Sequence, residues 1–290
     1  MIHDIQLERR NLHGHFSRDL PPILTIDPGD TFRFATLDAG WHSVPERQHF
    51  DDLDPELDAG HALVGPIEVR GARAGGTLEV HVDAVEVGTW GITFADDHGM
   101  LWTLDAAAGV GTGPAGATVT LAPFLGVLGM PPPESGVHST SPPRVSGGNI
   151  DCKELVGGTT LYLPIPVDGA LFSAGDGHAR QGDGEVSGTA IECPLARAEL
   201  TLTLRDDLEL HTPIARTPGA WLTLGFDEDV EAAAATATHA MLDLMERELG
   251  VDRREALALA SVVVDLRVTQ VVNGVKGIHA VLRDDAIRMG

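Results

Sequence analysis

The sequence predicts a mainly β fold with a pair of helices near the C-terminus. Its 290 residues include 34 glycines and 18 prolines but only 4% aromatic residues, a composition typical of many short strands and turns. Several segments alternate apolar and polar residues with a period of two, whereas one late alanine-rich segment has apolar residues at helical spacing. The 43% of hydrophobic residues is enough to build a sizeable core.

The alternating segments predict the first strands. Residues 23–26 and 31–34 read as two strands joined by an Asp-Pro-Gly-Asp turn. Residues 67–70 and 78–82 alternate cleanly, so we expect two half-buried strands there.

Residues 88–146 are predicted to be mostly irregular. Their first part, with Trp90 and Phe94, predicts a loop or lid, and a strand is expected only at residues 118–121. The next stretch is apolar, rich in turn formers and without hydrophobic period, which is typical of functional loops. It supplies candidates for the wall of a small pocket: Phe124, Leu125, Leu128 and Met130.

The C-terminal third changes character. Strands are predicted at residues 199–204 and 220–224, and a helix over residues 227–250 ends at Gly250. A second helix begins at Asp252, where Glu255 completes the spacing of a capping box. Two strands then close the fold, so the helical pair packs on one side of a sheet. A single domain over residues 1–290, with a sheet shared between its halves, is favoured over a division near residue 150.

Charge and cysteine content limit the partners. The net charge of −23 and the pI near 4.7 argue against nucleic acid and against an anionic membrane surface. The N-terminal residues lack the apolar segment of a signal peptide, so we expect a cytoplasmic protein. There Cys152 and Cys193 stay reduced, and buried thiols are favoured over a disulfide. High-salt adaptation and a GC-rich genome explain the acidity equally well.

Residues 147–193 hold the densest set of reactive side chains. One polar group lies before an apolar segment that Pro164 and Pro166 interrupt, and a second group follows it. The first comprises Asn149, Asp151, Lys153 and Glu154, and the second Asp176, His178, Gln181, Asp183 and Glu185.

The second group offers ligands for a metal ion. Asp176, His178 and Glu185 are predicted in a glycine-rich turn, and carboxylate and imidazole groups suit zinc or another divalent transition ion. Two alternatives stay open. The carboxylates cap turn amides while the histidine packs at the surface, or the group is catalytic without metal.

In the first group, a period of two places Asn149, Asp151 and Lys153 on one strand face. A lysine beside a carboxylate can hold a proton donor next to a base, as amide hydrolysis requires. A structural ion pair is the alternative. Cys152 points the opposite way.

The chain resembles the acetamidase/formamidase family from about His15 to Leu282. The most characteristic residues are GGNIDCK and GDGHARQGDGE, which match the pair GGNxDxK and GDxHxxQGDGE. Further similar segments are HALVGPIEVRGA, PFLGVLGMPPP and DLRVTQVVNGVKGIHAVL. The resemblance implies a mainly β fold of sandwich or barrel type, α+β overall. It also implies hydrolysis of small amides to a carboxylate and ammonia, and a homo-oligomer, with this chain on the short acetamidase-like branch.

The resemblance and the residues together give a working set of roles. Asp151, Lys153 and Glu185 are catalytic, and Asn149, Gln181 and Asp183 bind substrate. A divalent metal, with zinc favoured, is held by His61, Asp176, His178 and Glu192, and Asp38 is a neighbour. Formamidases tend to have an aliphatic residue in place of Cys152, which argues against a thiol nucleophile.

Several alternatives stay open at this point. A carboxylate that activates water without metal is the second mechanism. The substrate alternatives are a small lactam or a carbamate, and a non-catalytic protein that binds metal or a small molecule is the remaining class. Near the C-terminus we expect Asp265 to pair with Arg267, while Gln270, Asn273 and His279 finish the sheet edge or reach the site.

Overall fold

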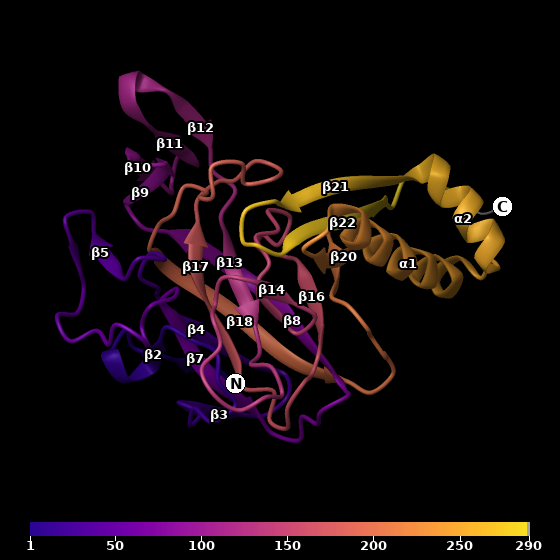
Figure 1. The fold of residues 1–290 in the computed structure, drawn as a ribbon, viewed down its shortest axis with the longest axis horizontal. Helices are drawn as coiled ribbons and strands as arrows, with labels where there is room; N and C mark the ends of the chain where they lie inside the picture. The colour runs from indigo at the N-terminus through magenta and orange to yellow at the C-terminus, as the bar shows by residue number, and fades with distance from the viewer. Residues whose placement is uncertain (289–290) are drawn as a thin grey trace.

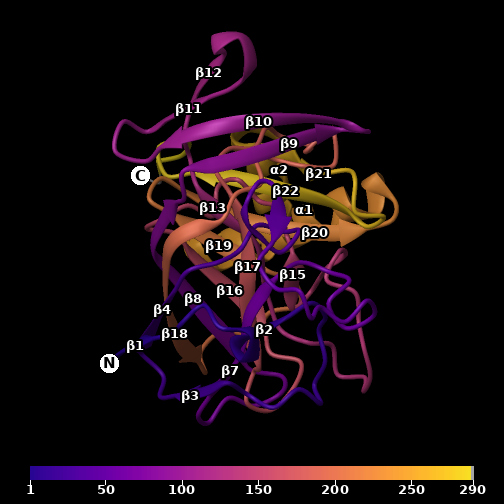
Figure 2. The same cartoon turned by 90° about the vertical axis from the view of Figure 1, so that its left-hand side faces the viewer.

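The computed structural model describes residues 1–288 and confirms a mainly β architecture with two helices near the C-terminus (Figure 1). A sheet of nine strands and a sheet of seven strands share one hydrophobic core. A sheet of four strands and the helical pair extend from different sides of this body (Figures 1 and 2).

The nine-stranded sheet combines strands from the whole length of the chain. In spatial order its strands are β1 (Ile2–Asp4), β4 (Asp30–Phe34), β18 (Leu195–Arg205), β8 (Thr77–Val87), β16 (Thr160–Pro164), β19 (Ile214–Thr217), β20 (Ala220–Asp227), β22 (Lys276–Arg283) and β21 (Val264–Gln270).

The seven-stranded sheet carries most of the residues discussed below. Its strands are β14 (Pro143–Arg144), β15 (Gly147–Asn149), β13 (Phe124–Gly129), β17 (Phe172–His178), β7 (Leu63–Val69) and β2 (Leu12–His13), with β3 (Leu24–Ile26) pairing with β7. Strands from both sides of residue 150 therefore contribute to both large sheets.

The remaining elements are short or project outward. The four-stranded sheet contains β12 (Thr118–Thr120), β11 (Val110–Thr112), β10 (His98–Asp105) and β9 (Trp90–Ala95), and β5 (His42–Val44) pairs with β6 (Arg47–Gln48). Two 3-10 turns are η1 (Arg9–Asn11) and η2 (Pro114–Gly116).

The strands predicted at residues 23–26 and 31–34 are present as β3 and β4, and they belong to different sheets: β3 joins β7, while β4 lies between β1 and β18. Residues 67–70 and 78–82 alternate between buried and less buried positions as predicted, and β7 also extends back over residues 63–66, which are buried throughout. The prediction that residues 88–146 are mostly irregular is wrong, because this stretch holds strands β9 to β14, and β13 is buried at every position. A strand buried on both faces has no alternation for a period-two search to find.

Aromatic and branched side chains fill the space between the two large sheets. Phe32 of β4 contacts Phe172 of β17, with ring centroids 6.3 Å apart. Leu78, Val80 and Val82 alternate along β8 into the same core. At about 1.5–3 kcal/mol for each fully buried large apolar side chain, this core supplies the main stabilisation.

The helical pair packs on one side of the nine-stranded sheet as expected: α1 lies on β20 and β22, while α2 contacts α1 and β21. Helix α1 (Val230–Leu249) begins where the Asp229 side chain accepts hydrogen bonds from two backbone amides, and it ends at Gly250 in the left-handed conformation. Helix α2 (Arg253–Val263) begins in the same way at Asp252. The alanine face of α1 lies so close to the sheet that a Cβ at Gly225 would meet the Ala233 carbonyl oxygen at 2.1 Å.

Within residues 1–288, no helix is long and apolar enough to cross a membrane. Cys152 and Cys193 are both free and buried.

Candidate active site

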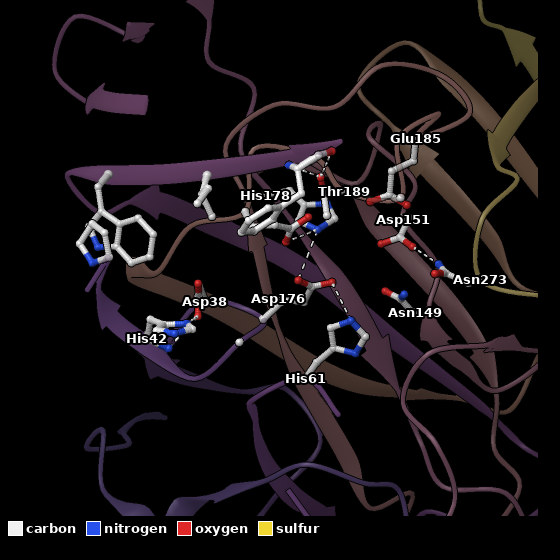
Figure 3. A pocket seen from close by; sticks show the side chains of 18 residues that line it. Asp38, His42, His61, Asn149, Asp151, Asp176, His178, Glu185, Thr189 and Asn273 are labelled. Carbon is white, nitrogen blue, oxygen red and sulfur yellow. Dashed lines mark hydrogen bonds and ion pairs between the residues drawn. The ribbon is translucent and has the colours of Figure 1, made fainter. Parts of the chain in front are cut away.

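A cavity of about 270 Å³ lies where the seven-stranded sheet meets the β9–β10 hairpin (Figure 3). Its size falls just below the usual range of about 300–1,000 Å³ for ligand pockets, which suits a small ligand. Trp90, Ile92 and Phe94 of β9 form an apolar wall. The polar lining residues are Asp38, His42, His61, Asn149, Asp151, Asp176, His178, Glu185, Thr189, Glu192 and Asn273.

Strand β17 delivers Asp176 and His178 to the cavity. The prediction of a glycine-rich turn at these residues is wrong, because both belong to a fully buried strand between β13 and β7. Gly126 of β13 faces them from the neighbouring strand. A Cβ at Gly126 would lie 2.4 Å from Asp176 Oδ2 and 2.8 Å from Asp151 Oδ1. The absence of a side chain at this position is what lets the two carboxylates approach each other.

Asp151 reaches the cavity from an irregular segment. Strand β15 ends at Asn149, so the predicted strand face shared with Lys153 does not exist. The Asp151 Oδ2 atom accepts a hydrogen bond from Asn273 Nδ2 at 2.7 Å. Asn273 belongs to the turn between β21 and β22, and it therefore reaches the site rather than finishing the sheet edge.

Three of the cavity carboxylates sit on left-handed backbone. The φ angles are 51° at Asp151, 61° at Asp176 and 46° at Glu185. Non-glycine residues in this region cost on the order of 1–3 kcal/mol each, and such residues concentrate at functional sites. The fold therefore holds these three side chains in place at the expense of stability.

His178 is oriented by Gln181. The Nδ1 atom of His178 donates to Gln181 Oε1 at 3.0 Å, while Gln181 Nε2 donates to the Asp151 carbonyl oxygen at 2.7 Å. With the proton on Nδ1, the neutral ring presents the Nε2 lone pair to the cavity. That Nε2 atom lies 3.3 Å from Asp176 Oδ1 and 3.1 Å from Glu192 Oε2.

His61 approaches Asp176 from the other side (Figure 3). Its Nδ1 atom is bound to the Thr140 hydroxyl at 2.7 Å, and its Nε2 atom lies 4.0 Å from Asp176 Oδ2. Hydrogen bonding at one ring nitrogen again leaves the other directed at the carboxylate.

The donor set fits a divalent metal ion. Two groups of three ligand atoms lie within 4.8 Å of one another, and both include His178: one with Asp176 and Glu192, the other with Asp151 and Glu185. Within residues 1–288, four buried oxygens here have no hydrogen-bond partner: Asn149 Oδ1, Asp151 Oδ1, Asp176 Oδ1 and Glu192 Oε2. Buried oxygens are normally paired. Asp176 Oδ1 and Glu192 Oε2 face His178 Nε2 at 3.3 and 3.1 Å, so once His178 is neutral all four oxygens are available to a cation or a substrate.

The cavity carboxyls differ in the direction of their pKa shifts, although burial acts on all of them in the same direction. Burial raises the pKa of Glu192 to about 7, and it raises the pKa of Glu185. Burial, followed by the neighbouring Glu185, also raises the pKa of Asp151 well above its usual value. Burial acts in the same direction on Asp176, but His178 and His61 hold the pKa of that carboxyl below its usual range.

The histidine responds in the opposite sense. Although burial favours its neutral form, Glu192 and Asp176 raise the pKa of His178 well above the usual value. In the metal-free protein His178 is therefore the positive charge among four carboxylates.

Lys153 and Asp183 lie outside the cavity lining. The Lys153 Nζ atom pairs with Asp183 Oδ1 at 2.8 Å, and Asp183 Oδ2 accepts from Arg267 Nη2 at 2.7 Å. Arg267 also bonds Glu154 at 2.7 Å, so the expected pair with Asp265 is wrong. Gln181 is buried but supports His178 and Asp151 from behind rather than lining the cavity.

The apolar wall comes from a segment that the sequence leaves without regular structure. Phe124, Leu125, Leu128 and Met130 belong to the core instead of lining the cavity, so the predicted pocket wall is wrong. Trp90 and Phe94, expected in a loop or lid, do line the cavity, but as part of strand β9. His42 was missed, although its backbone amide bonds the neighbouring Asp38 carboxylate at 2.7 Å.

Known proteins share this arrangement of strands over the whole chain. An acetamidase from Bacillus halodurans superimposes with a TM-score of 0.86 at 29% identity, covering 96% of this chain and 97% of that one. A predicted acetamidase/formamidase from Thermoanaerobacter tengcongensis gives a TM-score of 0.87 at 24% identity, covering 98% and 97%. These matches confirm the expected fold.

The sequence comparisons agree with the structural ones. An acetamidase from Mycolicibacterium smegmatis is 26% identical over 250 residues, which span 60% of this chain and 61% of that relative's length. The model of the Acetamidase/Formamidase family matches residues 3–112 and 133–282, which include every residue that lines the cavity. With its fold, its cavity residues and most of its length matched, this chain belongs to the acetamidase/formamidase family.

Proposed function

We propose that this protein hydrolyses the C–N bond of small linear amides, such as acetamide and formamide, to a carboxylate and ammonia. The observation that carries the proposal is the convergence of four unpartnered buried oxygens on one small cavity. The names of the family and of its relatives supply the substrate class.

Asn149 and the apolar wall suit the substrate. The unpartnered Asn149 Oδ1 atom can accept a hydrogen bond from the N–H of a primary amide, which fixes the leaving nitrogen. Trp90, Ile92 and Phe94 line the cavity together with the polar residues, and the space beside them accommodates a short acyl group. A cavity of about 270 Å³ favours amides of few carbon atoms.

Asp151 and Glu185 are placed for the proton transfers. In the reaction water adds to the amide carbon, the C–N bond breaks, and the leaving nitrogen gains a proton. Burial raises the pKa of both carboxyls, so each holds a proton more readily than a free carboxyl does. One accepts the proton of the attacking water, and the other delivers a proton to the nitrogen. Lys153, which pairs with Asp183, has no direct part in this scheme.

A divalent ion, with zinc favoured, completes the proposal. Asp176, His178 and Glu192 would hold it, with His61 close by. Such an ion would polarise the carbonyl oxygen and lower the pKa of water. Gln181 supports this set by fixing the tautomer of His178.

A panel of substrates tests the activity. We expect ammonia release from formamide and acetamide, less from longer amides, and none from a small lactam, whose cleaved nitrogen stays attached to the product. Asp151→Asn serves as the inactive control. A folded, metal-supplied protein that releases no ammonia from any linear amide would contradict the proposal, and ring opening of the lactam alone would replace it with a lactamase activity.

Chelation tests the metal separately. We expect exhaustive chelation to abolish ammonia release and zinc to restore it, with metal content measured by elemental analysis. Full activity in protein shown to be metal-free would leave the carboxylates as the only activators of water.

The homo-oligomer implied by the family resemblance is a further proposal. Phe94 and Leu101 on the β9–β10 hairpin are 39% and 51% exposed, and such side chains are suited to a subunit contact. Light scattering after size-exclusion chromatography measures the subunit number, and a monomer at micromolar concentration would contradict this proposal.

A further inference from the structure

Cys152, Glu154 and His279 form a second cluster of ligand atoms, behind the cavity. Cys152 Sγ lies 3.4 Å from Glu154 Oε2, and His279 Nε2 lies 3.5 Å from the same oxygen. All three atoms fall within 4.8 Å of one another. Cys152 and His279 are 0% and 1% exposed, so this is a built interior site rather than a group of surface charges.

The ring of His279 is held with one nitrogen directed into the cluster. Its Nδ1 atom is bound to the Thr269 hydroxyl at 2.8 Å. Thr269 is the extra residue of a bulge in β21, between Val268 and Gln270, which turns its side chain toward β22. The Nε2 atom is buried and has no hydrogen-bond partner within residues 1–288. A buried nitrogen left in this way costs about 1–3 kcal/mol, so its orientation needs an explanation.

Glu154 presents one oxygen to the cluster in the same manner. Its Oε1 atom accepts from Arg267 Nη1 at 2.7 Å, which leaves Oε2 to face the thiol and the imidazole. Charged partners that fix one side of a ligand group are typical of metal sites.

Two of the three ligand separations match those around a tetrahedral ion. Ligands at about 2.0–2.3 Å from a tetrahedral zinc are roughly 3.3–3.8 Å from one another. The two separations measured from Glu154 Oε2 already lie in this interval. Thiolate, imidazole and carboxylate are also the ligand types that zinc accepts.

We propose that Cys152, Glu154 and His279 bind a divalent transition-metal ion of the zinc type, with water in the fourth position. This site is independent of the ion proposed for the cavity and shares no ligand with it. Asp151 faces the cavity and Cys152, the next residue, faces the second site. The ion therefore has a positioning role: it fixes the segment that carries Asp151.

Cobalt binding separates this site from the cavity, because only this site supplies a thiolate. Chelator-stripped protein is titrated with Co²⁺, and the near-ultraviolet charge-transfer band of a Co²⁺–thiolate bond is recorded. We expect the wild type to reach the band intensity of one Co²⁺–thiolate bond per chain, and Asp176→Asn, whose change lies in the cavity, to reach the same intensity. Cys193→Ser is the matched control for the other buried thiol and keeps the band.

Cys152→Val is expected to lose the band, and His279→Gln to weaken cobalt binding at this site at least tenfold. The proposal is overturned when the wild type gives no thiolate band, when Cys193→Ser abolishes the band, or when His279→Gln binds cobalt as tightly as the wild type. If Cys152→Val does not fold, the Cys193→Ser and His279→Gln variants still decide the question.

Discussion

Two clusters of charged residues come from the same short segments of the chain, but they differ in how their carboxylates are paired. The cavity cluster contains Asp151, Asp176, Glu185 and Glu192 around His178, and within residues 1–288 three of these carboxylates, those of Asp151, Asp176 and Glu192, each keep one buried oxygen without a hydrogen-bond partner. The outer network contains Lys153, Glu154, Asp183 and Arg267, whose charges pair at 2.7–2.8 Å. Asp151 and Lys153 are two residues apart, as are Asp183 and Glu185, yet each pair is divided between the two clusters.

The carboxyl pKa values shift in different directions in the two clusters. Although burial acts to raise both values, His279 and Arg267 hold the pKa of Glu154 below its usual value, and Lys153 and Arg267 do the same for the pKa of Asp183. In the cavity, burial raises the pKa of Asp151, Glu185 and Glu192. The outer carboxylates, which pair with Lys153 and Arg267, stabilise the fold, whereas Asp151, Glu185 and Glu192, whose pKa values burial raises, stay available to a ligand or a proton.

The largest effect is expected from Asp151→Asn. The substitution keeps the shape of the side chain and removes its proton chemistry, so kcat/KM for acetamide should fall by about 10²–10⁴-fold. Asp183→Asn is the matched control in the outer network and should change kcat/KM by less than about tenfold. Equal losses in the two variants would remove the functional distinction between the clusters.

The stability of the chelated protein should fall as pH rises from about 5 to 8. The pKa of Glu192 is about 7 in the folded state and 4.5 in the unfolded state. Ionising Glu192 in the folded protein therefore lowers the free energy of unfolding by about 3 kcal/mol. This loss is absent below pH 4.5 and complete above pH 7. His178, with a raised pKa, loses its stabilising charge in the same direction. Urea unfolding at both pH values measures the change, and Glu192→Gln should flatten it. Stability that rises with pH would contradict the assigned pKa directions.

Glu185→Gly should give a more stable protein that has lost activity. Glycine accepts a φ of 46° without strain, and the substitution removes a buried carboxylate, so the free energy of unfolding should rise by about 1 kcal/mol. Thermal unfolding and ammonia release measure the two effects. Glu185→Ala keeps the backbone strain and separates it from the loss of charge. A Glu185→Gly protein less stable than Glu185→Ala would show that the backbone at this position is not strained.

The smallest effect is expected from Lys153→Ala. The pair with Asp183 is partly exposed, and such pairs contribute about 0–1 kcal/mol. We expect kcat/KM within a few-fold of the wild type. A loss comparable with that of Asp151→Asn, in a folded protein, would instead place Lys153 in the reaction.

The sequence predicts the strands that alternate and the helices that carry caps, because these features are local. It also places Asp176, His178 and Glu185 in one group, and the structure brings them to one cavity. Strands β13 and β17 are buried on both faces and show no alternation, so the sequence does not predict them over their observed lengths. Strand β7 is predicted only over its alternating second half, because its first half is buried throughout.

Other features of the site depend on contacts that no local pattern encodes. The left-handed backbone at Asp151 turns the chain after β15 and sends Lys153 away from the cavity. Trp90 reaches the site through the packing of a projecting hairpin. The spacing of GGNIDCK does not reveal the direction of Lys153, and no motif around Trp90 reveals that it lines the cavity.

The hydrogen bond between Asn273 and Asp151 joins positions 122 residues apart. The active site therefore cannot be completed until the ribosome has made the chain as far as Asn273. A chain still growing on the ribosome can form β13, β15 and β17 with their carboxylates in place. It lacks the side chain that holds Asp151 until the turn after β21 has been made. Premature termination before that turn therefore yields a fragment with nearly all of the reactive groups but without the hydrogen bond that holds the Asp151 carboxylate.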